Sequence, residues 1–329
     1  MRPILFVLVL AAPLAAQSAP PFNFVMPHGS GRIVIDLGPG WEPQSAALLD
    51  NASRPTILIT NKSNGLDLSY ILFPNQTGGP TAESCRDAAV GPILQNLGAS
   101  AVSNESRTIR KLPEGRSLAT ASYLIGKVGT VTLNQQNIFG FFGDKNTCAE
   151  IHLSKIRYTP ADEKLFNAEL DKFAFDATYA PNSQDYGAMA TIYFQQTHDP
   201  RSAAVYYQTA LDSLATPIGG YDVTTMRRVL TDQLSMSYGM SGDLKRSREV
   251  NEAAILKDPT YPLYYYNLAC ADAEAGNATA ARGHLQQASD RRANTLKGEP
   301  FPDPSTDDSI LKLKDNKAFW AFVQSLPKT

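Results

Sequence analysis

The C-terminal half of the sequence repeats itself every 34 residues, and this periodicity constrains the fold more than any other feature. Three identical pairs stand 34 positions apart, and the segments around them align without a gap: Leu234 with Leu268, Gly242 with Gly276, and Ala254 with Ala288. A unit of this length cannot bury its apolar face alone, so neighbouring copies must stack to form a continuous core. The sequence therefore predicts a stacked repeat domain.

The residue types within the unit indicate which repeat this is. The copy at 262–295 carries Tyr265, Leu268, Ala269, Gly276, Ala281, Leu285 and Ala288, and the copy at 228–261 carries Thr231, Leu234, Ser235, Tyr238, Gly242, Ser247, Ala254 and Pro259. This pattern resembles the tetratricopeptide repeat, and the resemblance implies helix pairs stacked into an all-α superhelix. Thr231, Asn251 and Asp272 depart from it, because each stands where an apolar or aromatic residue is expected.

An earlier copy and a closing segment complete the predicted domain. Phe194, Ala203, Tyr207 and Ala210 fall in register if a first copy occupies 184–217, followed by a loop that contains Pro217, Gly219 and Gly220. We expect residues 306–327 to form helices that cap the last repeat with Ile310, Leu311, Leu313, Phe319, Trp320, Phe322 and Val323. The Pro-rich connector before them cannot be one continuous helix.

The N-terminal half, residues 20–178, reads as an α+β domain with a mainly antiparallel sheet. Alternating or β-branched runs predict strands at 32–37, 56–60, 66–73, 117–126, 130–142 and 148–156. A helix should begin at Ala82 and break or restart at Pro92. A second helix is predicted after a capping box of Thr159 and Asp162, with Leu165, Phe166, Leu170 and Phe173 on the face that meets the sheet. The opening GSGRIVIDLGPGWEP and the closing CAEIHLSKIRYTPADEKLFNAELDKF resemble the Mog1/PsbP-like α/β/α sandwich, which implies a fold and little chemistry. We expect the boundary between the two halves at 178–183.

Residues 1–19 have the layout of a secretory signal peptide. Arg2 precedes an apolar run from Ile4 to about Ala12, and small residues follow from Ala15 to Ala19. We therefore expect an exported protein, periplasmic or secreted, with no membrane span after signal removal. In an oxidising compartment we expect Cys85 and Cys148 to pair, because both lie in one predicted domain; two separate buried thiols are the alternative.

Charge and motifs narrow the function classes. The net charge is -2, so no global basic field exists to hold nucleic acid. The four histidines are scattered, and no motif for a metal, a phosphate or a nucleophile surrounds them. Glu150 and His152 should point to the same side of a strand. We favour the interpretation that this side faces solvent over the alternative that the two residues form an acid/base pair. We expect no enzyme activity and no cofactor.

The tetratricopeptide resemblance implies a concave groove that takes an extended peptide or a helix. The groove residues it implies are Gln195, Gln196, Asp232, Gln233, Met236, Met240, Tyr266, Asn267, Cys270 and Glu274. A basic clamp for a terminal carboxylate is not expected, because Asp232 and Tyr266 stand where lysines would be needed. The favoured function is an exported, non-enzymatic adaptor or scaffold that binds another protein or peptide in this groove. The alternative is a small-ligand-binding or enzymatic N-terminal domain with the repeats as a docking arm.

Overall fold

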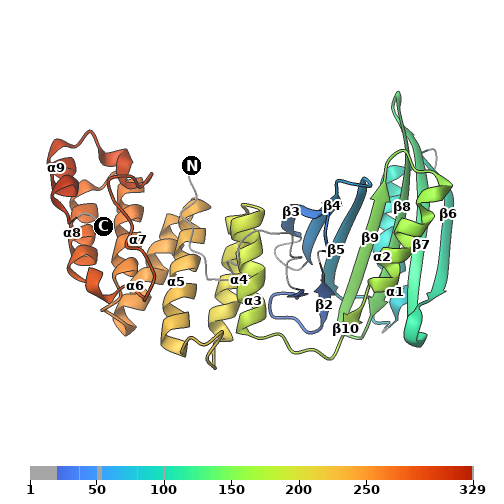
Figure 1. Cartoon of the computed structure of the whole chain (residues 1–329), viewed down its shortest axis with the longest axis horizontal. Helices are drawn as coiled ribbons and strands as arrows, with labels where there is room; N and C mark the ends of the chain where they lie inside the picture. The colour runs from blue at the N-terminus through green and yellow to red at the C-terminus, as the bar shows by residue number, and fades with distance from the viewer. Residues whose placement is uncertain (1–20, 37, 50–53, 80, 99–100, 328–329) are drawn as a thin grey trace. The chain divides into compact units, whose positions relative to one another are not determined.

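The computed structural model describes residues 21–36, 38–49, 54–79, 81–98 and 101–327. The predicted signal peptide lies outside these residues. The described chain divides into two compact units between Ser202 and Ala203. The first is an α+β unit and the second consists of consecutive helices, which confirms the predicted fold class (Figure 1).

The first unit is built on a seven-stranded antiparallel sheet with the order β3-β4-β5-β9-β8-β7-β6. Its strands are β3 (Trp41–Leu49), β4 (Arg54–Asn61), β5 (Leu66–Pro74), β6 (Val102–Lys111), β7 (Ser117–Val128), β8 (Val131–Gly143) and β9 (Thr147–Lys155). Two meanders, β3–β5 and β6–β9, meet where β5 pairs with β9, with Leu68 opposite Leu153. A three-stranded sheet, β1 (Phe22–Phe24), β2 (Arg32–Ile35) and β10 (Phe175–Asp176), accompanies them in the order β1-β2-β10.

Helix α1 (Ala82–Leu97) covers one face of the large sheet. Cys85 of α1 is bonded to Cys148 of β9, which confirms the predicted disulfide. Gly143 of β8 lies opposite Cys148, and a Cβ at Gly143 would stand 2.5 Å from Cys85 Sγ, so the close approach of the helix needs glycine there. The predicted break at Pro92 is wrong, since α1 continues through it. Pro92 and Ala88 are both exposed, so water can reach the carbonyl that the missing N–H leaves unpaired.

Helix α2 (Glu163–Lys172) covers the opposite face, after a short turn η2 (Pro160–Asp162). The capping box is confirmed, because Asp162 Oδ2 accepts a hydrogen bond from the Thr159 N–H at 2.9 Å. Phe166 and Leu170 are buried, and the Phe173 ring lies 5.1 Å from that of Phe142. A short turn η1 (Pro113–Gly115) links β6 to β7.

The first unit also includes α3 (Ser183–Thr191) and the π-helical turn η3 (Ile192–Gln196). Helix α3 packs against β1, and η3 packs against β3. Asp185 accepts hydrogen bonds from Asn23 at 2.7 Å and from the Tyr179 hydroxyl at 2.7 Å. The Tyr193 hydroxyl donates to the Thr56 carbonyl at 3.2 Å. Because of these contacts the packing division falls after Ser202, later than the 178–183 segment expected from sequence.

The second unit contains the remaining helices. They are α4 (Pro200–Asp212, in this unit from Ala203), α5 (Val223–Met240), α6 (Leu244–Lys257), α7 (Pro262–Glu274), α8 (Ala278–Asp290) and α9 (Lys317–Ser325), with short turns η4 (Arg292–Asn294) and η5 (Ile310–Leu313). Helices α6 and α8 begin 34 residues apart, as the sequence period requires. Helices α5 and α6 pack as a pair, as do α7 and α8. This arrangement is compatible with tetratricopeptide-like repeats.

The two aligned copies differ in how they fill the same core positions. The copy of α7 and α8 places Ala269, Ala281 and Leu285 in an apolar cluster. At the equivalent positions, the copy of α5 and α6 buries Ser235, Ser247 and Asn251. The Asn251 amide donates to Ser235 Oγ at 2.5 Å and to the Ser247 carbonyl at 2.8 Å. The polar departure at Asn251 is therefore matched by two serines.

A second departure, Asp272, forms polar contacts with a basic side chain and a histidine. Its buried carboxylate accepts a hydrogen bond from Arg248 of α6, and its second oxygen lies 2.6 Å from His284 Nδ1 of α8. One acid on α7 thus links the helices before and after it, in place of an aromatic packing contact.

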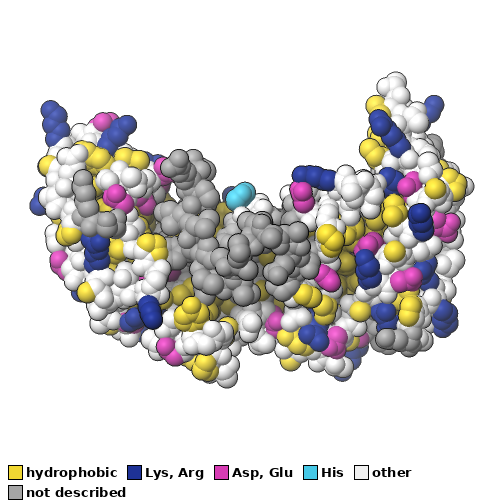
Figure 2. All heavy atoms as spheres, in the orientation of Figure 1, with side chains coloured by type: hydrophobic (Ala, Val, Ile, Leu, Met, Phe, Trp, Pro, Cys, Tyr) yellow, Lys and Arg dark blue, Asp and Glu magenta, His cyan; other side chains and the backbone are white. Residues whose placement is uncertain are grey.

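The closing segment covers the last helix pair. Ile310, Leu313, Phe319, Phe322 and Val323 are buried in one cluster with residues of α7 and α8. In the described part of the chain no helix has the length and apolar character to cross a bilayer. On the face shown in Figure 2, acidic and basic side chains are interspersed over each unit, in keeping with the near-balanced composition.

Candidate interaction surface on the helical unit

Helices α5 and α7 lie in contact, and the tetratricopeptide resemblance implies that they form the inner face of the helical unit. We define it by the residues that the repeat register places there: Asp232, Gln233, Met236 and Met240 on α5, and Tyr266, Asn267, Cys270 and Glu274 on α7. The Asn267 amide donates to Asp232 Oδ1 at 2.8 Å, which joins the two helices across the face. The sequence period therefore places these eight side chains on neighbouring helices.

Asp232 is the most perturbed acid of this face. Only 4% of the residue is exposed, and burial raises the pKa of its carboxyl to about 7, assisted by the nearby charge of Glu299. Hydrogen bonds from Asn267 and Gln233 oppose the shift, because they stabilise the carboxylate. Near neutral pH the Asp232 carboxyl is thus poised between its charged and neutral forms.

The chain covers part of the inner face with its own Pro-rich connector. We call residues 296–309 the strap. Glu299 of the strap accepts a hydrogen bond from the Tyr261 hydroxyl at 2.5 Å, and the Phe301 ring meets the Tyr266 ring edge-on with centroids 5.8 Å apart. Further along, Cys270 Sγ lies 3.7 Å from Asp307 Oδ1. Just beyond the strap, Lys312 pairs with Glu274.

The strap places two carboxyl groups, those of Glu299 and Asp307, in partly buried positions on the helices. Burial raises the pKa values of Glu299 and Asp307 above their ordinary range, although hydrogen bonds to both carboxyls oppose the shift. Burial, together with the charge of Asp307, also holds the pKa of the Cys270 thiol and of the Tyr266 hydroxyl well above normal. The contacts of the strap with α7 therefore depend on carboxyls whose charged forms are disfavoured.

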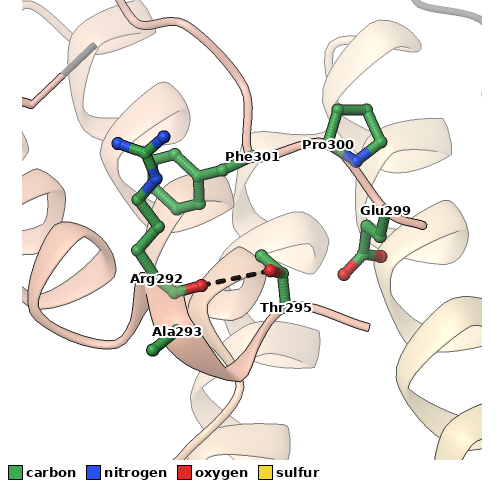
Figure 3. A pocket seen from close by; sticks show the side chains of 6 residues that line it. All are labelled: Arg292, Ala293, Thr295, Glu299, Pro300 and Phe301. Carbon is green, nitrogen blue, oxygen red and sulfur yellow. Dashed lines mark hydrogen bonds between the residues drawn. The ribbon is translucent and has the colours of Figure 1, made fainter. Parts of the chain in front are cut away.

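A hollow of about 640 Å³ lies beside the strap. It is lined by Arg292, Ala293, Thr295, Glu299, Pro300 and Phe301. Figure 3 shows Arg292 and Phe301 lying side by side along one part of it, with Glu299 on the opposite side. The Thr295 hydroxyl donates to the Arg292 carbonyl at 3.1 Å and holds the turn that leads into the strap. The strap thus leaves open space against its own unit.

The residues expected in the groove differ in accessibility. Asp232, Gln233 and Tyr266 are buried, and Met236, Asn267, Cys270 and Glu274 are half-buried. Met240 is 63% exposed. Gln195 and Gln196 are also exposed, but they lie on η3 in the first unit. The sequence reasoning missed the strap, although aromatic and acidic residues in the Pro-rich connector were a signal that it could pack on a helix.

A second group of polar residues lies on the sheet face that α1 partly covers. Glu150 and His152 share this face, as expected. The prediction that the face is solvated is wrong for Glu150, which is only 4% exposed. Burial raises the pKa of Glu150 to about 7 despite the nearby charge of Arg54, and burial lowers the pKa of His152 to about 4. His152 Nε2 lies 3.2 Å from Asn137 Oδ1, and its ring stacks on Phe139 at 4.1 Å. Neighbouring strands thus enclose two titratable groups in the sheet.

Comparison with known proteins assigns no family, because no family model and no curated protein matches the chain. Among solved structures, one from Bacteroides thetaiotaomicron VPI-5482 aligns with 63% of this chain and 78% of its own, at 10% identity and a TM-score of 0.31. A multi-domain immunophilin from Arabidopsis thaliana aligns with 67% of this chain and 93% of its own, at 8% identity and a TM-score of 0.25. Both TM-scores are too low to define a shared fold. Function must therefore be argued from this chain's own residues.

Proposed function

We propose that this chain is an exported, non-enzymatic adaptor whose tetratricopeptide-like helices bind a segment of another protein along the inner face of α5 and α7. The observation that carries the proposal is that an irregular segment, the strap, already packs on this face through the ring contact of Phe301 with Tyr266, and beside it through the hydrogen bond of Glu299 with Tyr261. A helix face that binds one irregular segment of the chain has the chemistry to bind a segment of another protein.

The accessible part of the same face supports a partner contact. Met240 is exposed and Met236 is half-buried, one helical turn apart on α5. Methionine side chains are flexible and polarisable, so they adapt to different partner surfaces. Export accords with the disulfide Cys85–Cys148, since such bonds persist in oxidising compartments.

The proposal is tested by cross-linking and affinity capture of the full chain from its native exported fraction. The informative variant is Met236→Glu/Met240→Glu, and the matched control is Leu256→Glu, because Leu256 is an 87% exposed apolar residue on α6. We expect one specific partner to be captured by the wild type and by the control and to be lost with the double variant. Capture that is equal with all three proteins contradicts a binding role for this face.

A further inference from the structure

The strap is most exposed between Lys297 and Asp303, and the buried Pro304 follows directly. After it, Ile310 and Leu313 are buried in the cluster of α7 and α8. Before it, Arg291 Nε donates to the Pro259 carbonyl at 2.8 Å. Between these points Lys297, Gly298, Pro300 and Asp303 are exposed, while Glu299 and Phe301 are only half-buried. Residues 297–303 are therefore the part of the strap that the helices cover least, and their contacts with α7 run through Glu299 and Phe301.

The contacts of the strap specify what the α7 face recognises. Tyr261 donates a hydrogen bond to the Glu299 carboxylate, and Tyr266 presents its ring to the edge contact with Phe301. These two strap residues are separated by Pro300, whose ring fixes its own φ, and residues 299–303 form no helix, strand or turn. Arg228 lies over the Tyr261 ring at 5.2 Å, and its charge stabilises the ionised form of Glu299. The face thus holds a carboxylate, a proline and an aromatic side chain in that order.

We propose that the strap occupies the partner's site in cis, and that the partner is an extended, proline-containing segment with a carboxylate two residues before an aromatic side chain. This inference rests on the proposed function. It adds the chemistry of the partner segment and the displacement of the strap that must precede its binding. The partner segment places its carboxylate on the Tyr261 hydroxyl and its aromatic ring on Tyr266, after the strap has moved away. A shallow hollow borders Glu299 and Phe301, and the charge of Glu299 disfavours ionisation of Asp232 on α5.

The test uses a fluorescent peptide with the sequence of residues 296–309 and the full-length chain. The strap is weakened by Glu299→Gln/Phe301→Ala, and a cooperative unfolding transition with unchanged helix content establishes that the variant is folded. Loss of one aromatic contact and of the hydrogen bond to the Glu299 carboxyl should open the site, so the peptide should bind the variant at least about tenfold more tightly than the wild type. A peptide that itself carries Phe301→Ala should lose that binding.

Three results overturn the proposal: no binding to the folded variant, equal affinity for variant and wild type, or preference for a control peptide with lysines at 299, 303 and 307. The last result shows that the opened face selects a basic segment. Partner capture that depends on Met236 and Met240 without any peptide binding retains the proposed function and rejects the strap as its mimic. Peptide binding without partner capture retains the strap's site as a peptide-binding site and rejects the proposed adaptor function.

Discussion

The side-chain amide of Asn251 donates a hydrogen bond to Ser235 Oγ at 2.5 Å, in the core between α5 and α6. Ser235 Oγ also lies 3.0 Å from Ser247 Oγ, so three polar residues are linked by hydrogen bonds where the next repeat has only apolar groups. Asn251 Oδ1 is buried without a hydrogen-bond partner among the described residues. A buried acceptor of this kind costs stability.

Replacing the polar group by its counterpart from the next repeat should stabilise the helical unit. We expect Ser235→Ala/Ser247→Ala/Asn251→Leu to raise the free energy of unfolding by about 1 kcal/mol, because the unpaired Asn251 Oδ1 disappears and Leu285 shows that leucine packs at the equivalent place. Asn251→Ala alone should lower it by about 2 kcal/mol, since it leaves a cavity and a changed serine pair. Urea unfolding followed by Trp320 fluorescence in a Trp41→Phe background measures both. A triple variant less stable than the single one contradicts the repeat equivalence.

The disulfide should stabilise the sheet unit and leave the helical unit unaffected. Cys85 and Cys148 are 63 residues apart, so their bond restricts the unfolded chain by about 4 kcal/mol on the chain-entropy model. Cys85→Ala/Cys148→Ala should therefore lower the stability reported by Trp41 in a Trp320→Phe background. Trp320, studied in a Trp41→Phe background, is the internal control. Equal losses at both tryptophans would mean that the two units unfold together.

Glu150 should make the sheet unit less stable as the pH rises. Burial raises its folded pKa from 4.5 to about 7, so its favourable contribution is complete below pH 4.5 and is lost as the pH rises through about 7. We expect Glu150→Gln to gain roughly 2 to 3 kcal/mol relative to the wild type between pH 5 and pH 8. Comparing each protein with itself at the two pH values cancels the constant cost of the substitution.

His152, on the same sheet face, should give a pH dependence of stability opposite in sign to that of Glu150. Its folded pKa is lowered from 6.5 to about 4 by burial, so its contribution is complete above pH 6.5 and is lost as the pH falls through about 4. His152→Gln should therefore gain stability relative to the wild type on acidification. Denaturant midpoints at pH 4, 6 and 8 test both variants, and parallel pH profiles for Glu150→Gln and His152→Gln would reject the assignment.

The reaction rate of the Cys270 thiol should report whether the strap is docked on α7. Cys270 lies beside Asp307, and the folded pKa values of Asp307, Glu299 and Asp232 are all raised, so docking of the strap is favoured at low pH and weakens as these carboxyls ionise. We expect the thiol's reaction rate, divided by the rate for the urea-unfolded chain at the same pH, to increase between pH 5 and pH 8. Asp232→Asn should flatten that increase, and a ratio independent of pH contradicts a strap whose docking weakens as these carboxyls ionise.

Periodic and local signals were enough to predict much of this fold. The 34-residue interval predicted the two aligned helix pairs, and Thr159 with Asp162 predicted the start of α2, because each signal depends on residues close in sequence. Strands β3 and β6 were not recognised. Both lie at edges of the sheet, where β3 contains Pro43 at a bulge and β6 is mostly exposed and polar, so neither carries a buried strand's pattern.

The candidate surface was predictable only in part for a similar reason. The repeat register placed Tyr266 on the inner face, but register does not determine what covers that face. The contact between Tyr266 and Phe301 joins residues from a helix and from an irregular segment, and its residues follow no period. Likewise, the burial of Glu150 depends on how the strands assemble, and its own strand shows only that it shares a side with His152.

The order of strands has a consequence for how the chain emerges during synthesis. Strand β5 pairs on one side with its immediate predecessor β4, but its other neighbour is β9. Asp67 of β5 therefore has its partner Ser154 only after the chain has been synthesised as far as β9. A nascent chain that has completed the first meander therefore displays the unpaired backbone of the apolar segment LDLSYILFP until the second meander follows. Unpaired strand edges of this kind template aggregation in general, and pairing with β9 removes this one.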